Sequence, residues 1–262
     1  MRDDNSYFLF NPGRSGHLPA FSSTPNASLP IISLVFLCYN ATMFHSLYNR
    51  ATNSLPATAT QPDKNGHLDK TFLNWPANYL DGFQNFDPDH WQLEVGGLVE
   101  RPQEFGLKDM NNFTRIQQNR RLVFADGWTY RASWEGFVLQ ELLHRVMPKP
   151  EAKYLIQTNL SGHRECIPLK DLYAQRALLC LRVNGKPLPS MYGGPMRLMV
   201  FDRYAHKGLG QIVKLELSEE EIPGYFADKG YDPAAQIDPG SYYAADLKIV
   251  QTIKAPGEVT QW

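Results

Sequence analysis

Cysteine is scarce in this sequence, and charge of either sign is not in excess. The three cysteines, Cys38, Cys166 and Cys180, form no close pair, so a zinc ribbon and a disulfide-stapled scaffold are excluded. The 262 residues include 26 Lys+Arg and 27 Asp+Glu, which gives a formal net charge of -1. A near-neutral chain has no global field that attracts polyanions, so we expect no nucleic-acid partner.

Several common catalytic motifs are also missing. The sequence contains no Gly-rich phosphate loop and no G-x-S-x-G elbow. His144, His163 and His206 are widely separated and do not have the spacing of metal ligands. From the residues alone we therefore predict no catalytic residue and no metal site.

The first part of the chain differs from the rest, because no charged residue occurs between Arg14 and Arg50. This window contains the apolar segment 29–48, LPIISLVFLCYNATMFHSLY, and about 20 mainly apolar residues suffice to cross a bilayer. We predict a single transmembrane helix over 29–48. A buried or interfacial helix and a signal peptide with an extended N-region are the alternatives; the segment lacks a twin-arginine motif and a clear small-residue cleavage site.

The chain divides into four parts on this basis. An N-terminal extension covers 1–28, the helix covers 29–48, a polar linker covers 49–72, and a folded domain covers 73–262. Short strand-like segments with interspersed helices predict an α+β domain with a mixed or largely antiparallel sheet. The expected strands are 91–98, 121–124, 153–158, 177–183, 196–201, 212–218 and 247–253, and the expected helices are 107–113, 137–146 and 169–174.

Three blocks of the domain carry a family resemblance. They read WQLEVGGLVERPQEFGLKDM from residue 91, ADGWTYRASWEGFVLQELL from residue 125, and NGKPLPSMYGGPMRL from residue 184, with YAHKGLGQI following. In order and spacing these blocks resemble the molybdopterin domain of the sulfite oxidase family. The bacterial periplasmic oxidoreductases of that family, including a methionine-sulfoxide reductase catalytic subunit, are the most similar. The resemblance implies a sulfite-oxidase-like fold.

The resemblance also identifies a departure at the metal site. In the family a cysteine thiolate four positions before the motif tryptophan ligates molybdenum. Four positions before Trp128 stands Phe124, which has no lone pair to offer a metal. We therefore expect a degenerate ligand position and no cofactor. The alternative is a molybdopterin held without a protein thiolate.

Six polar residues remain at positions that the resemblance places near a pterin or its phosphate. Basic groups can bind an anion if they converge, so the six are candidates for a vestigial pterin or anion pocket. The alternative is surface and structural charge. The six candidates are Asp126, Arg164, Arg197, Arg203, His206 and Lys207.

Together these features predict a non-catalytic accessory subunit of a membrane protein complex, respiratory or photosynthetic. Its partners would be the lipid bilayer and integral membrane subunits, reached through the 29–48 helix and the domain surface. It would be a single-pass membrane protein with a periplasmic domain. One alternative is a molybdopterin-dependent oxidoreductase that acts on sulfite or an S- or N-oxide with non-standard metal ligation. Another is a small-anion-binding module.

Overall fold

The computed structural model describes residues 84, 86–173 and 177–262. The predicted extension, transmembrane helix and linker lie outside the described residues, as do Cys38 and the first residues of the predicted domain. Among the helices that are described, none is long and apolar enough to cross a membrane.

One sheet of the described domain has five strands. β1 (Gln92–Gly97) lies between β2 (Gln103–Gly106) and β10 (Ile212–Ser218), and β5 (Tyr154–Asn159) and β6 (Arg164–Pro168) follow β10. β1 and β10 run parallel, while the other neighbours are antiparallel. The sheet is therefore mixed, as predicted.

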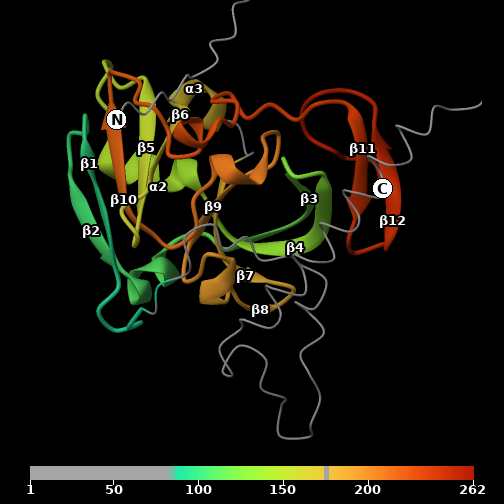
Figure 1. Cartoon of the computed structure of the whole chain (residues 1–262). Coiled ribbons are helices and arrows are strands. Elements are labelled where there is room, and N and C mark those ends of the chain that lie inside the picture. Colours follow the sequence, from blue (N-terminus) through green and yellow to red (C-terminus); the bar gives the residue numbers. More distant parts are fainter. Residues whose placement is uncertain (1–83, 85, 174–176) are drawn as a thin grey trace, which may run out of the picture. The chain divides into compact units, whose positions relative to one another are not determined.

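A second sheet is built around β4, the longest strand described. β3 runs antiparallel to β4 along one side, and β7 and β11 pair with different parts of β4 along the other. β12 extends the sheet beyond β11, at the red end of the chain (Figure 1). The strands of this sheet are β3 (Ile116–Phe124), β4 (Trp128–Val138), β7 (Ala177–Val183), β8 (Lys186–Pro187), β9 (Arg197–Val200), β11 (Gly240–Ala244) and β12 (Ile249–Ile253).

Helices are short in the described part of the chain. They are η1 (Leu107–Asn112), α2 (Leu139–Val146), α3 (Leu169–Leu172), η2 (Ser190–Tyr192), η3 (Ala205–Lys207) and η4 (Ala227–Lys229). α2 buries Leu139, Leu142, Leu143 and Val146, the spacing of one helix face. This face packs into the main core together with buried residues of β1, β5, β7, β9 and β10.

The predicted elements agree with the structure where the apolar pattern is simple. Strands occur at or near all seven predicted segments, and short helices occur near the three predicted ones. The helix expected from Phe137 begins instead at Leu139, because β4 continues to Val138. β4 itself was not predicted. Its sequence WTYRASWEGFV places Arg131 and Glu135 among residues that are mostly buried, so neither a regular alternation nor an apolar run identifies it.

Gly136 allows β4 to approach β7 closely, where the register of the two strands shifts. A Cβ at Gly136 would lie 2.0 Å from the carbonyl oxygen of Leu179. We expect Gly136→Ala to lower the free energy of unfolding by about 3 kcal/mol, since a packed backbone cannot make room. Gly96→Ala is the matched control: its Cβ would come no closer than 3.9 Å to Glu94. Urea unfolding of both variants measures the difference, and equal stabilities would contradict the close approach.

Candidate functional site

A tight turn joins β3 to β4, and two stacked rings close it. The ring centroids of Phe124 and Trp128 lie 3.6 Å apart with an interplanar angle of 10°, and both residues are buried. Asp126 is exposed in the turn, and its carboxylate accepts a hydrogen bond from the Trp128 side chain. The position that the resemblance gives to the metal ligand is therefore filled by an aromatic ring held against its neighbour.

The loop that carries η3 lies beside the end of β3. Val123 forms a parallel bridge with Tyr204, the residue immediately before η3 (Ala205–Lys207). This bridge brings the segment with His206 close to the Phe124–Trp128 turn, although about 80 residues separate them in the sequence. The tertiary structure thus joins two of the blocks that carried the resemblance.

Arg197 begins β9 and directs its guanidinium toward this loop. Its Nη2 donates to the carbonyl oxygen of Ala205 at 3.0 Å, and its Nη1 donates to that of Tyr192 at 3.4 Å. Its Nε is buried without a hydrogen-bond partner. Burial lowers the pKa of Arg197 to about 10, so the group remains cationic at neutral pH. Within the described ranges no carboxylate pairs with it, which leaves a buried positive charge that an anion would satisfy.

His206 adds a second buried donor or acceptor next to Arg197. Its Nε2 has no hydrogen-bond partner, and its ring is surrounded by Tyr204, Phe226 and Tyr231, with centroids 5.0–6.0 Å away. Burial, together with the positive charges of Lys207 and Arg197, lowers the pKa of His206 to about 4. The imidazole is therefore neutral at physiological pH, with one nitrogen still available to a ligand.

Lys207 is held by a partner that sequence reasoning missed. Its Nζ donates to Glu165 Oε1 at 2.8 Å and also to the carbonyl oxygen of Pro233, and both charged side chains are buried. Gln157, also missed, accepts from the Leu209 amide at 2.9 Å and donates to the Lys207 carbonyl at 3.0 Å. Neither residue had a signal in the sequence, because each lies next to other polar residues in a short strand and about 40 to 50 residues from its partner.

The remaining candidates do not join this cluster. Arg164 is exposed on β6, 4.0 Å from Glu216. Arg203 pairs with Asp171 at 3.2 Å, and Asp126 is exposed in the β3–β4 turn. The structure therefore brings only some of the six candidates together. Arg197 and His206 come together, and Lys207 lies next to them but is bound to Glu165.

Two glycine motifs shape the backbone around Arg197. A Cβ on Gly193 would lie 2.6 Å from the Cα of Gly210, and one on Gly208 would lie 2.0 Å from the carbonyl oxygen of Leu198. Gly193 also has a φ of 99°, which disfavours other residues. The G-G-P and K-G-L-G segments thus allow their backbones to pack against each other and against β9, the strand that begins with Arg197.

Comparison with known families gives the site its context. A family described as "Oxidoreductase molybdopterin binding domain" matches residues 81–226. The chain belongs to this family. The match covers the five-stranded sheet, the second sheet except β11 and β12, and the cluster of Arg197 and His206, and the resemblance seen in the sequence is confirmed.

The individual proteins that this chain resembles have low sequence identity to it. The chain is 28% identical over 146 residues to the uncharacterized oxidoreductase YuiH of Bacillus subtilis, covering 55% of the chain and 74% of that protein. It is 27% identical over 164 residues to the protein-methionine-sulfoxide reductase catalytic subunit MsrP of Ralstonia nicotianae, covering 56% of the chain and 49% of that subunit. A chain in the crystal structure of the sulfane dehydrogenase SoxCD from Paracoccus pantotrophus matches with a TM-score of 0.51 at 21% identity, covering 55% of this chain and 42% of that chain. The chain thus spans about half the length of MsrP.

These comparisons correct the expectation about the cofactor and change which function is favoured. The expectation of no cofactor is wrong at the level of the family, which is defined by molybdopterin binding. The relatives named as a reductase catalytic subunit and an oxidoreductase support the oxidoreductase alternative over the non-catalytic subunit. Nothing in them supports a photosynthetic complex, a membrane anchor or a pseudoenzyme.

The described residues fit one end of a molybdopterin better than the other. The buried, unpartnered nitrogens of Arg197 and His206 suit an anionic group such as the phosphate of the pterin. At the metal end, Phe124 supplies no ligand atom. Throughout the part of the chain that the structure describes, no group of three or more His, Cys, Asp or Glu side chains is placed to hold a metal ion.

The low pKa of His206 makes stability depend on pH. The imidazole has a pKa of about 4 in the folded protein against 6.5 as a free group, so the unfolded chain binds the proton first as the pH falls. The contribution of His206 to stability is therefore complete above pH 6.5 and lost as the pH falls toward 4. NMR titration of the ring nitrogens should give a midpoint near 4 for His206. A midpoint near 6.5 would contradict its burial in the aromatic cluster.

Proposed function

We propose that this chain is a molybdopterin-binding oxidoreductase domain that acts on a small sulfur or nitrogen oxide, such as sulfite, an S-oxide or an N-oxide. The observation that carries the proposal is the half-buried Arg197, whose Nε is buried without a hydrogen-bond partner and which has no carboxylate partner among the described residues, inside a domain of the molybdopterin-binding family. Two relatives with a substrate in their names, a methionine-sulfoxide reductase subunit and a sulfane dehydrogenase, support a sulfur compound as the substrate.

Arg197 and His206 would hold the anionic end of the cofactor. The guanidinium keeps its positive charge in a buried place, where a charge-assisted hydrogen bond is strong. His206 stays neutral, so its Nε2 can donate to a phosphate oxygen or accept from a protonated one without adding charge. Gln157 and the Lys207–Glu165 pair fix the loop that presents His206, and this limits the reorganisation that binding requires.

The metal end of the site would rely on the cofactor's own ligands. When bound, a molybdopterin would supply a metal, held by its own dithiolene sulfurs, that can exchange two electrons with the substrate. The protein would contribute the buried, stacked rings of Phe124 and Trp128 at this end. Asp126 is the nearest carboxylate in the same turn and is a candidate for proton transfer, since it is solvent-accessible.

The cellular location and the membrane partners of the domain stay predictions. The 29–48 segment predicts a single-pass anchor with the domain in the periplasm, and partners in a membrane complex follow from it. An oxidoreductase must exchange electrons with another molecule, so a membrane-bound redox partner is compatible with this proposal.

Arg197→Met tests the anion-binding role. The full chain is produced in cells that make molybdopterin, and the purified protein is analysed for bound pterin by fluorescence after oxidation and for molybdenum by elemental analysis. We expect pterin in the unchanged protein. In the variant we expect pterin affinity to fall about 10- to 100-fold, because a charge-assisted hydrogen bond contributes about 1.5–3 kcal/mol.

Arg182→Met is the matched control. Arg182 lies on the neighbouring strand β7 and pairs with Glu135 at 3.3 Å near the surface, so its loss should leave pterin content unchanged. Folded, unchanged protein without pterin or molybdenum would contradict the proposal. Binding of inorganic phosphate by such protein would favour the small-anion module instead.

A further inference from the structure

Exposed apolar side chains gather on the hairpin formed by β11 and β12. The described residues contain six exposed large apolar side chains, and four of these lie between positions 243 and 250. The four are Tyr243, Leu247, Ile249 and Val250, the last of which is 64% exposed. Single exposed apolar residues are common on any protein, but a contiguous group of them marks an interaction surface.

The turn of the hairpin brings the four side chains together. Tyr243 lies opposite Val250 in the strand register. Leu247 and Lys248 lie in the turn, where both amides donate to the Ala244 carbonyl, at 3.1 and 2.7 Å. β12 is the end strand of its sheet, so no strand among the described residues lies beyond it (Figure 1). The apolar group thus surrounds the turn at an open edge of the sheet.

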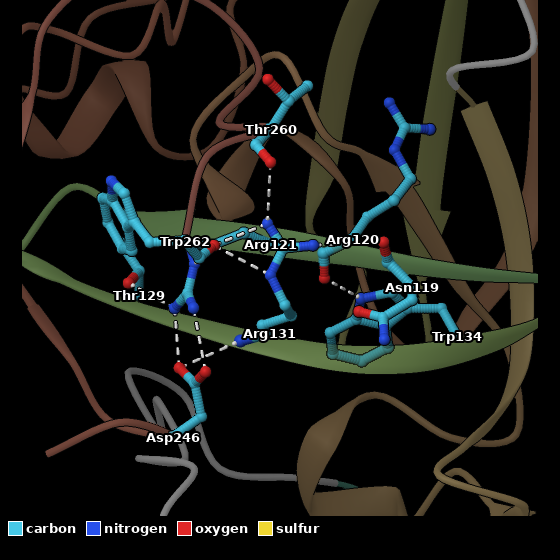
Figure 2. Close-up of polar contacts among 9 residues, drawn as sticks. All are labelled: Asn119, Arg120, Arg121, Thr129, Arg131, Trp134, Asp246, Thr260 and Trp262. Carbon is cyan, nitrogen blue, oxygen red and sulfur yellow. Dashed lines mark hydrogen bonds and ion pairs between the residues drawn. The ribbon is translucent and has the colours of Figure 1, made fainter.

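The charges of residues 240–262 are divided by sign. The Asp246 carboxylate accepts two hydrogen bonds from the buried Arg121 guanidinium, at 2.6 and 2.9 Å (Figure 2). Glu258 is ion-paired with the neighbouring arginine of β3. Lys248 and Lys254, by contrast, are exposed, so the charge beside the apolar group is positive. We call the four apolar residues and these two lysines the hairpin patch.

The hairpin is fastened to the domain from its inner side. The Tyr243 amide donates to the Gly127 carbonyl and the Ala245 amide donates to the Thr129 carbonyl, both at 2.9 Å. Arg121, which binds Asp246, also donates to the Thr129 hydroxyl at 3.0 Å. None of the six patch side chains has a part in these bonds. The fold therefore fixes the position of the hairpin patch through other groups and leaves its side chains exposed.

We propose that the hairpin patch binds the surface of a membrane that contains anionic phospholipids. Apolar side chains can enter the boundary between headgroups and acyl chains, while lysines beside them contact the phosphates. Tyrosine is enriched at the same level of a bilayer. An apolar turn with a positive border fits this surface, which presents apolar chains behind a layer of negative charge. The inference rests neither on the proposed cofactor nor on the predicted 29–48 anchor, because all six residues lie on the hairpin or next to it.

The first experiment places a fluorescent reporter on the hairpin patch in the full chain. Val250→Cys is combined with Cys38→Ser, since Cys166 and Cys180 are buried, and the introduced thiol is labelled with an environment-sensitive fluorophore. The protein is mixed with vesicles of phosphatidylcholine and phosphatidylglycerol whose acyl chains are brominated. Bromine quenches only a fluorophore that reaches its depth, so the signal reports insertion of the patch itself and not attachment of the chain elsewhere.

Met147→Cys in the same background is the matched control. Met147 is 43% exposed but lies beside the end of β1, where its carbonyl accepts from the Glu100 amide at 2.8 Å. We expect at least about threefold stronger quenching at position 250 than at position 147. Equal quenching, or none at position 250 in the folded protein, would overturn the proposal. A label at position 250 that is shielded without lipid, in protein that sediments as a dimer, would assign the patch to a second copy and would also overturn it.

A second experiment tests the charges with the same label at position 250. Lys248→Gln with Lys254→Gln is compared with Lys108→Gln with Lys170→Gln, which removes the same charge from exposed positions on η1 and α3. Each lysine near an anionic bilayer strengthens binding about fivefold. The phosphatidylglycerol content needed for half-maximal quenching should therefore rise in the first pair and stay unchanged in the second. The same requirement in both pairs, or quenching that is independent of phosphatidylglycerol, would overturn the proposal.

Discussion

The backbone hydrogen bonds of β4 hold the candidate site together. β3 pairs with β4 from Ile116 opposite Gly136 to Phe124 opposite Trp128, and β7 and β11 pair with its other side. β7 in turn pairs with β9, which begins with Arg197. The turn with Phe124 and the loop around Arg197 are thus linked through consecutive strands, so their relative position follows from strand register and not from flexible side chains.

Arg121 and Arg197 lie in the same sheet but differ in whether a carboxylate of the fold compensates their charge. Arg121 is completely buried and has Asp246, Thr129 and a main-chain oxygen as partners, so its charge is compensated by the fold. Arg197 is also buried at its Nε but has only main-chain partners. An uncompensated buried charge destabilises a fold unless a ligand completes it. This contrast is the physical reason to place ligand binding at Arg197.

The substitution at Phe124 and the family membership can be reconciled on the same geometry. Family membership rests on residues 81–226, and the proposed anion-binding end consists of Arg197 and His206. Phe124 changes only the turn between β3 and β4, where it stacks on Trp128. The binding of a cofactor and the ligation of its metal by the protein are therefore separate properties, decided by different residues.

The sequence by itself determined the mixed α+β class, most strand positions and the family, and it named Arg197 and His206 among six candidate residues. These rest on local patterns: apolar periodicity, turn residues and short motifs whose order is preserved. The tertiary structure decided which charges meet. Lys207 pairs with Glu165, Arg203 with Asp171, and Arg121 with Asp246, and none of these pairs is close in sequence. Because an ion pair depends on distance in space and on burial, only the packed strands could distinguish the Arg197 guanidinium, which has no carboxylate partner among the described residues, from the ion-paired Arg121 and Arg203.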